Sequence, residues 1–201
     1  MALNVKRLTL NVLVAILDAL SLNCHRMTNS GEYLIVSSSL KSRSRSRVMA
    51  DYLATCLQEQ SISPGLIDLR TSVLPLCDGE AAYGHPEVGV LSEKIAAARV
   101  LLVATPIYNF DANAALKNLV ELTGRSWQEK IVGFICAAGG TMSYMSIMGL
   151  VNSLMLDFRC LIIPRFVYAT SRDFAEHELI STEVKERIRE LVSVSTKIKY
   201  Q

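Results

Sequence analysis

The segment that most constrains the fold is residues 99–108, RVLLVATPIY, a largely apolar run without regular alternation of polar and apolar residues. A strand that has helices on both faces of its sheet shows this pattern, because both of its side-chain rows are buried. Parallel sheets are usually covered in this way, whereas antiparallel sheets often leave one face in water. The segment therefore predicts a central strand of an α/β fold.

Four other segments have strand character, and longer segments with helical patterning separate them. The predicted strands are residues 32–39, 65–69, 99–108, 130–140 and 159–170. The predicted helices are residues 47–60, 88–98, 111–124 and 180–198, with residues 141–157 between the last two strands. Asp111 is the expected N-cap and Gly124 the expected end of the helix at 111–124. Five strands that alternate with helices predict a five-stranded parallel sheet in a three-layer α/β domain.

The composition indicates a globular domain and argues against a nucleic-acid partner. The chain has 201 residues, of which 50% are hydrophobic and 20% charged, with 5 Pro and 10 Gly, as in a globular domain with a sizeable core. The net charge is +2, and charges of both signs are dispersed along the chain. The sequence therefore indicates no broad positive electrostatic field that would attract a polyanionic partner. The RSRSR stretch at residues 43–47 is too short for RNA binding and lacks stacking aromatics. We therefore expect no nucleic-acid partner.

The N-terminal segment is the ambiguous part of the chain. Two basic residues precede an apolar run from Leu8 to Leu22, which Asn11 and Asp18 interrupt. The run is short for a membrane span, and the residues before Cys24 form a poor cleavage context for a secretory signal. We expect an extra helix that covers part of the core or forms a subunit contact, with membrane-surface attachment or a targeting segment as the alternatives. This divides the chain into an N-terminal helical extension at residues 1–30 and one domain at residues 31–201.

Cysteine and histidine residues do not form a recognisable metal or nucleophile motif. The five cysteines include no CxxC pair, and the three histidines are dispersed along the chain. No nucleophile elbow with a serine is present either. The cysteine usage indicates a reducing compartment, so we expect a cytoplasmic protein without a metal site.

The stretch LIVSSSLKSRSRSRVMADYL, from Leu34 to Leu53, places serines and basic residues directly after the first predicted strand. The hydroxyl donors are Ser37, Ser39, Ser44 and Ser46, and the charged donors are Lys41, Arg43 and Arg45. A helix that begins near Ser46 would point its positive end at the same place, as phosphate sites require. The loop lacks the glycine spacing of a P-loop or of a dinucleotide fold. It is therefore either a phosphate site of another kind or an exposed basic loop.

Two more loops follow the third and fourth predicted strands. ATPIYNFDANAALKN, residues 104–118, places Tyr108 in a turn before a helix, and AAGGTMSYM, residues 137–145, carries the pair Gly139–Gly140. Either loop alone is compatible with an ordinary turn. Because parallel strands bring their carboxyl ends to one edge, the three loops together would suit a ligand with a phosphate and a flat ring.

The chain resembles the NAD(P)H-dependent FMN reductase family of flavodoxin-like proteins from about Glu32 to its C-terminus. SSLKSRSRS, residues 38–46, is similar to the family pattern G-S-L-R-x-x-S-x-N, and TPIYNFDANAALKN, residues 105–118, to T-P-E-Y-N-x-x-x-P-x-x-L-K-N. By this resemblance the cofactor-binding residues are Ser39, Lys41, Ser44, Arg45, Ser46, Pro106, Ile107, Tyr108, Asn109, Gly139, Gly140 and Thr141. The first five would hold the FMN phosphate and the others would lie along the ring system. The sequence departs from the family pattern at Ser38, which replaces Gly, at Ile107, which replaces Glu, and at Asn113, which replaces Pro.

The resemblance implies a flavodoxin-like three-layer sandwich with strand order 2-1-3-4-5. It implies an oxidoreductase that transfers hydride from NADPH or NADH to FMN and on to a small-molecule acceptor, without a catalytic side chain. It also implies a homodimer or homotetramer. Two alternatives stay open: a quinone, azo-compound or chromate reductase with tightly held FMN, and a non-catalytic flavodoxin-like binding protein. A flavodoxin-type electron carrier is disfavoured, because flavodoxins are strongly acidic and this chain is at +2.

Overall fold

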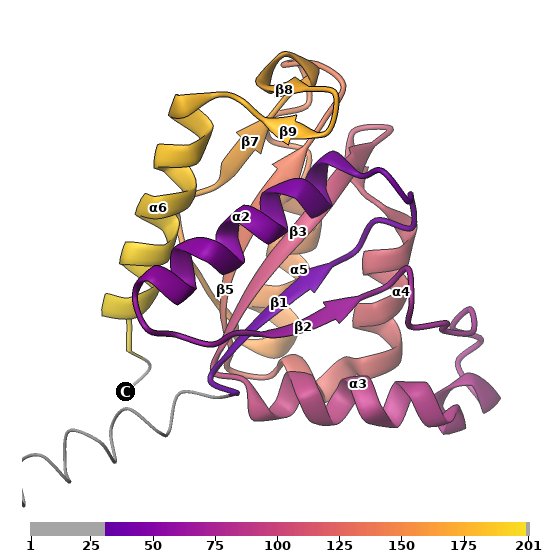
Figure 1. Ribbon diagram of the computed structural model, residues 1–201. Helices are drawn as coiled ribbons and strands as arrows, with labels where there is room; N and C mark the ends of the chain where they lie inside the picture. Colours follow the sequence, from indigo (N-terminus) through magenta and orange to yellow (C-terminus); the bar gives the residue numbers. More distant parts are fainter. Residues whose placement is uncertain (1–30, 200–201) are drawn as a thin grey trace, which may run out of the picture.

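The computed structural model describes residues 31–199 and shows a mostly parallel sheet between two layers of helices (Figure 1). The parallel strands are β1 (Tyr33–Ser37), β2 (Gly65–Asp68), β3 (Val100–Tyr108), β5 (Ile131–Ala137), β6 (Leu161–Ile162) and β7 (Val167–Ala169). Their order across the sheet is β2-β1-β3-β5-β6, with β7 also paired to β5. This architecture confirms the predicted fold class. The predicted N-terminal helix lies outside the described residues.

Five helices pack on the two faces of the sheet. They are α2 (Arg45–Glu59), α3 (Pro86–Ala97), α4 (Ala114–Thr123), α5 (Met148–Phe158) and α6 (Thr182–Lys197). Helices α2 and α6 cover one face, and α3, α4 and α5 cover the other (Figure 1). No helix among residues 31–199 is long and apolar enough to cross a membrane.

Strand β3 lies at the centre of both cores. Its side chains are buried from Val100 through Ile107, and they alternate between the two layers. Leu102 packs toward α2 and α6, whereas Leu101 and Val103 pack toward α3, α4 and α5. The double burial explains why the segment contains no polar row.

The fifth predicted strand, residues 159–170, is interrupted in the structure. It forms β6, which pairs with the start of β5, and β7, which pairs with its end. Pro164 lies in the gap, and a proline lacks the N–H that a continuous ladder needs. As a result, β7 places Ala169 beside Ala137, at the edge of the sheet where β5 ends.

Two small hairpins extend this edge. Strand β4 (Asp111–Ala112) pairs antiparallel with the end of β3, and β8 (Phe174–Ala175) pairs with β9 (Glu178–Leu179). The prediction that Asp111 caps the next helix is wrong: the N-cap of α4 is Asn113. Asp111 belongs to the hairpin, whose antiparallel pairing delays the start of the helix. Gly124 ends α4 with φ +37°, as predicted.

Candidate functional site

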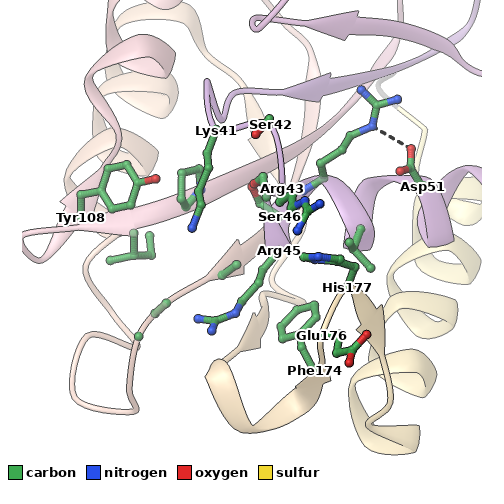
Figure 2. A pocket seen from close by; sticks show the side chains of 18 of the residues that line it. Lys41, Ser42, Arg43, Arg45, Ser46, Asp51, Tyr108, Phe174, Glu176 and His177 are labelled. Atoms are coloured by element: carbon green, nitrogen blue, oxygen red, sulfur yellow. Dashed lines mark hydrogen bonds and ion pairs between the residues drawn. The ribbon is translucent and has the colours of Figure 1, made fainter.

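A cavity of about 940 Å³ opens at the carboxyl ends of β1, β3 and β5 (Figure 2). The loop before α2 and the first turns of that helix form one end of it. The end of β3, the segment after β5 and the β8–β9 hairpin form the other walls. Its lining residues are Lys41, Ser42, Arg43, Ser44, Arg45, Ser46, Arg47, Val48, Asp51, Pro106, Ile107, Tyr108, Asn109, Ala137, Ala138, Gly139, Phe174, Glu176 and His177. The three loops singled out in the sequence therefore meet at one cavity.

The N-terminus of α2 forms the polar end of the cavity. Ser44 is the N-cap, and its hydroxyl accepts a hydrogen bond from the Arg47 N–H at 3.4 Å. The hydroxyls of Ser44 and Ser46 are 2.9 Å apart, and both side chains are buried. The first turn of the helix carries no acidic residue. Because a helix N-terminus is itself positive, this end of the cavity favours an anion.

The basic residues at this end differ in their partners. Arg47 forms ion pairs with Asp51, at 2.8 Å, and with Asp68. The guanidinium of Arg45 lies 5.9 Å from the ring centre of Phe174, a cation–π geometry. Within residues 31–199, no carboxylate forms an ion pair with Lys41, Arg43 or Arg45. Three positive charges therefore gather at a positive helix end without a protein anion to balance them.

The turn after β3 forms a second wall of the cavity. Asn109 and Phe110 both have positive φ, at 50° and 62°, and they connect the paired residues Tyr108 and Asp111. A two-residue hairpin with two left-handed positions has the form of a type I′ turn. The side chain of Tyr108 is 52% exposed, whereas Ile107 is buried beneath it at 8%. The wall thus combines a buried apolar residue with an aromatic ring that faces solvent.

The segment after β5 forms a third wall. The Ser171 hydroxyl donates to the carbonyl of Gly139 at 3.1 Å, and the Tyr168 hydroxyl donates to the carbonyl of Gly140 at 2.6 Å. A Cβ atom built on Gly139 would meet no atom within 4 Å, so open space lies beside it. Neither glycine has positive φ, in contrast to the turn after β3. The pair therefore provides open backbone rather than an unusual conformation.

Ser38 and Asn113, two positions at which the sequence departs from the family pattern, contact each other. The Ser38 hydroxyl donates to Oδ1 of Asn113 at 2.7 Å, and Nδ2 of Asn113 donates to the Ser38 carbonyl at 2.8 Å. The Thr105 hydroxyl also donates to Oδ1 of Asn113, at 3.0 Å. All three residues are buried. This network joins the start of the loop between β1 and α2 to the start of α4.

The structure brings most of the predicted site residues together. All of them line the cavity except Ser39, Gly140 and Thr141. Ser39 is buried, and its hydroxyl accepts a hydrogen bond from the Lys41 N–H at 3.3 Å. Gly140 and Thr141 are exposed and do not line the cavity.

Sequence reasoning missed the wall formed by the β8–β9 hairpin. Phe174, Glu176 and His177 line the cavity, although they are far in sequence from the loop before α2. No local motif marks them, because a sharp turn at Glu176, with φ 50°, places them there. Arg47 and Asp51 were also missed, although their helical spacing of four residues is a signal for an ion pair.

No cysteine is among the described residues that line the cavity, and two cysteines in the hydrophobic core are not activated. Burial raises the pKa of the Cys136 thiol to about 12 and that of Cys160 to about 11, so both stay protonated at neutral pH. Among residues 31–199, no group of three His, Cys, Asp or Glu side chains could hold a metal ion. The described lining residues supply hydroxyls and cations at the polar end of the cavity, and Asp51, Glu176 and His177 elsewhere along its wall.

Comparison with known proteins identifies the family. The model of the family described as NADPH-dependent FMN reductase matches residues 32–175. The chain belongs to this family. Family membership confirms the resemblance and the prediction of an NAD(P)H-dependent FMN oxidoreductase, which acts on a nicotinamide nucleotide and an electron acceptor.

Two relatives found by sequence carry names that agree with this family, and a solved structure shares the fold. An NAD(P)H-dependent FAD/FMN reductase of Geobacillus thermodenitrificans is 31% identical over 130 residues, which span 63% of this chain and 70% of the relative. An FMN reductase (NADPH) of Pseudomonas aeruginosa is 28% identical over 166 residues, which span 81% and 89%. The crystal structure of an NADH:FMN oxidoreductase in its apo form has a TM-score of 0.72 at 14% identity, covering 87% of this chain and 92% of that one. At that identity the structural match shows the shared fold alone.

The donor set of the cavity fits FMN. A phosphate needs several donors and positive charge, and the start of α2 supplies hydroxyls and cations that lack carboxylate partners. A flat ring needs a slot with open backbone and apolar sides, and the residues from Pro106 to Tyr108 and at Gly139 supply it.

Proposed function

We propose that this protein binds FMN with its phosphate at the N-terminus of α2 and its ring between the turn after β3 and the segment after β5. When bound, FMN would supply the redox chemistry, which is hydride acceptance from NADPH or NADH and electron transfer to a second, small-molecule acceptor. The observation that carries the proposal is that Lys41, Arg43 and Arg45, which form no ion pair with a carboxylate among residues 31–199, lie with the positive end of α2 at a cavity that has an aromatic wall.

The residues at the polar end would hold the phosphate by complementary means. The hydroxyls of Ser44 and Ser46 and the N–H groups of the first turn would donate hydrogen bonds, while Lys41 and Arg45 would supply charge. Ser39 would act from behind, because its hydroxyl accepts from the Lys41 N–H and so shapes the loop. Phe174 would keep the Arg45 guanidinium at the cavity through its ring.

The residues at the ring end would position the flavin and keep one face of the ring accessible. Pro106, Ile107 and Asn109 would lie along the ring, and Tyr108 would offer a half-exposed surface beside it. Gly139 would allow close approach, with Gly140 and Thr141 at the outer rim. No side chain needs to act as acid or base, because hydride transfer between nicotinamide and flavin requires placement above all.

Several finer statements belong to this proposal. We expect a cytoplasmic homodimer or homotetramer, an N-terminal extension at residues 1–30 and one flavodoxin-like domain at residues 31–201. Membrane-surface contact by the extension is the less favoured alternative. A reductase with tightly held FMN is the second candidate function, since an FMN-dependent NADH:quinone oxidoreductase of Shewanella loihica is 32% identical over 107 residues, covering 46% of this chain and 54% of that relative.

The proposal is tested by the visible spectrum of the purified protein and by nicotinamide oxidation. We expect NADPH or NADH to be consumed when FMN is added, and FMN to raise the melting temperature of the protein. Flavin that survives dialysis would favour the reductase with tightly held FMN. The absence of both flavin binding and nicotinamide oxidation would overturn the proposal and favour a non-catalytic binding protein.

A further inference from the structure

We propose that Asp68 and Arg70 are positioning residues that hold the loop before α2 in the shape that receives the FMN phosphate. Neither residue belongs to the cofactor-binding set named above, and neither lines the main cavity. The inference rests on the proposed function, because it assigns a role toward the same phosphate end.

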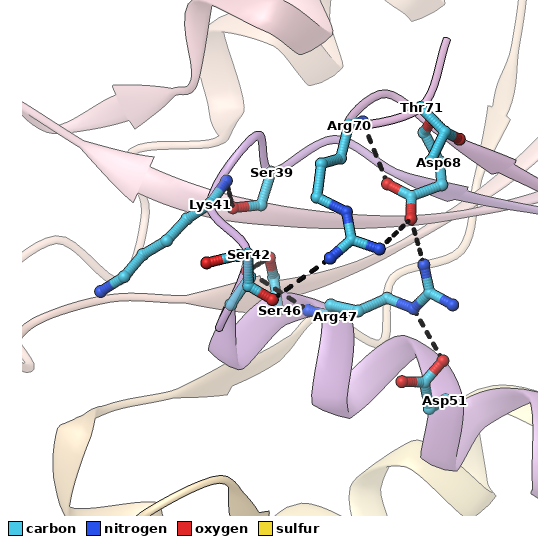
Figure 3. Close-up of polar contacts among 10 residues, drawn as sticks. Ser39, Lys41, Ser42, Ser46, Arg47, Asp51, Asp68, Arg70 and Thr71 are labelled. Carbon is cyan, nitrogen blue, oxygen red and sulfur yellow. Dashed lines mark hydrogen bonds and ion pairs between the residues drawn. The ribbon is translucent and has the colours of Figure 1, made fainter.

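Asp68 is the anchor of the arrangement (Figure 3). It ends β2, and its side chain is only 11% exposed. Its Oδ2 accepts from Arg47 on the first turn of α2 and lies 3.5 Å from Nη2 of Arg70, while its Oδ1 accepts from the Arg70 N–H at 3.0 Å. One carboxylate therefore joins the end of β2 to the start of α2.

Arg70 extends this anchor to the loop itself. Its Nη1 donates to the carbonyl oxygen of Ser42 at 3.3 Å (Figure 3). Ser42 lies two residues before the N-cap Ser44, in the middle of the basic loop. The loop is thus fixed at Ser42 by Arg70 and, just beyond its end, at Arg47 by Asp68.

The contact at Ser42 has an electrostatic consequence. Ser42 lines the cavity, yet its carbonyl oxygen is bonded to a guanidinium that does not line it. A carbonyl oxygen that faced a bound phosphate would repel it, so the Arg70 contact keeps a negative dipole end away from the anion. The same carboxylate pairs with Arg47, whereas Lys41, Arg43 and Arg45 form no ion pair with a carboxylate in the described part of the chain.

The test compares FMN with riboflavin, which has the same ring but no phosphate. Binding is measured by quenching of flavin fluorescence with the full chain and with the variants Arg70→Ala and Asp68→Asn. We expect the Kd for FMN to rise about tenfold in each variant, the size of one charge-assisted hydrogen bond, while the Kd for riboflavin stays within about twofold. Arg165→Ala is the matched control, since Arg165 pairs with Glu190 at 3.2 Å on an exposed surface away from the cavity.

A second measurement needs no ligand. Hydrogen exchange at the amides of residues 39–44 should be faster in Arg70→Ala than in the Arg165→Ala control, because the Ser42 tether is lost. Unchanged FMN affinity in both variants, or an equal loss of FMN and riboflavin affinity, would overturn the positioning role. If the unmodified chain binds neither flavin, the proposed function fails first, and the positioning role fails with it.

Discussion

The two ends of the cavity are built in different ways. The polar end depends on side-chain contacts: Ser44 caps α2, Asp68 binds Arg47, and Arg70 binds the Ser42 carbonyl. The ring end depends on backbone pairing, since β3 pairs with β4 and the Ala138 N–H donates to the Ala169 carbonyl at 2.8 Å. A single substitution can therefore alter the polar end strongly. At the ring end it has a smaller effect, confined to the segment after β5, where the hydroxyls of Tyr168 and Ser171 bond the carbonyls of Gly140 and Gly139.

Because of this difference, substitutions at the two ends should change the affinities for FMN and riboflavin differently. A change at the polar end should alter the affinity for FMN and spare riboflavin, because only FMN carries a phosphate. A change at the ring end should alter both affinities alike. Asn113 is the exception, since its side chain joins the start of the loop between β1 and α2, at Ser38, to Thr105 on β3.

The largest expected effect comes from removing this link. Asn113→Ala leaves the buried hydroxyls of Ser38 and Thr105 and the Ser38 carbonyl without their shared partner. The two hydroxyls keep only their longer contacts to the carbonyls of Ala104 and Pro106, both at 3.3 Å. We expect the free energy of unfolding to fall by roughly 2–3 kcal/mol, for the loss of three buried hydrogen bonds, and both flavin affinities to fall. Urea denaturation and fluorescence quenching measure the two effects.

A double variant makes this prediction sharper. Asn113 has φ −66°, which proline can adopt, and the family pattern has Gly and Pro at the two positions. Asn113→Pro alone should destabilise the protein, and adding Ser38→Gly should recover part of the loss by removing the buried hydroxyl that has lost its shorter hydrogen bond. Strictly additive changes would show that the two residues act independently. Ser153→Ala, on the exposed face of α5, serves as the neutral reference.

The fold and the polar end could be predicted from the sequence because their signals are local. The continuous burial of β3 appears as a largely apolar run, and the loop before α2 appears as hydroxyls and cations beside a helix start. The family resemblance then supplied the ring end at Tyr108 and Gly139. Each of these signals lies within a short stretch of chain.

The remaining features depend on contacts between distant segments. Phe174 and His177 reach the cavity because a hairpin after β7 turns back over α2, and Arg70 reaches Ser42 across the edge of the sheet. The start of α4 at Asn113 depended on the pairing of β4, which involves only two residues. Neither periodicity nor composition encodes such pairings.

The stability of the protein should also depend on alkaline pH, through a thiol on the strand that ends at the ring end of the cavity. Burial raises the pKa of Cys136, on β5 beside the ring end, from 9.0 to about 12. Between these values the unfolded chain loses a proton that the folded protein keeps, so stability is full below pH 9 and falls as pH rises. At pH 10 the loss is about 1.4 kcal/mol, or one pH unit of differential ionisation. Cys136→Ala should reduce the fall in urea midpoint between pH 8 and pH 10. If the midpoint fell by the same amount in the variant, the pH dependence would not come from Cys136.

The smallest expected effect tests the ring end alone. Tyr168→Phe removes the hydroxyl that donates to the Gly140 carbonyl and contacts Ser143 at 2.7 Å. Loss of about 1 kcal/mol of hydrogen bonding should loosen the glycine segment and raise the Kd for FMN and for riboflavin by about fivefold each. Tyr144→Phe is the control, because the Tyr144 hydroxyl makes no hydrogen bond to the described residues and its ring packs edge-on against Tyr168 at 5.4 Å. If Tyr168→Phe weakened FMN binding without weakening riboflavin binding, the glycine segment would act on the phosphate. The two ends of the cavity would then be coupled through the loop after β5 as well as through Asn113.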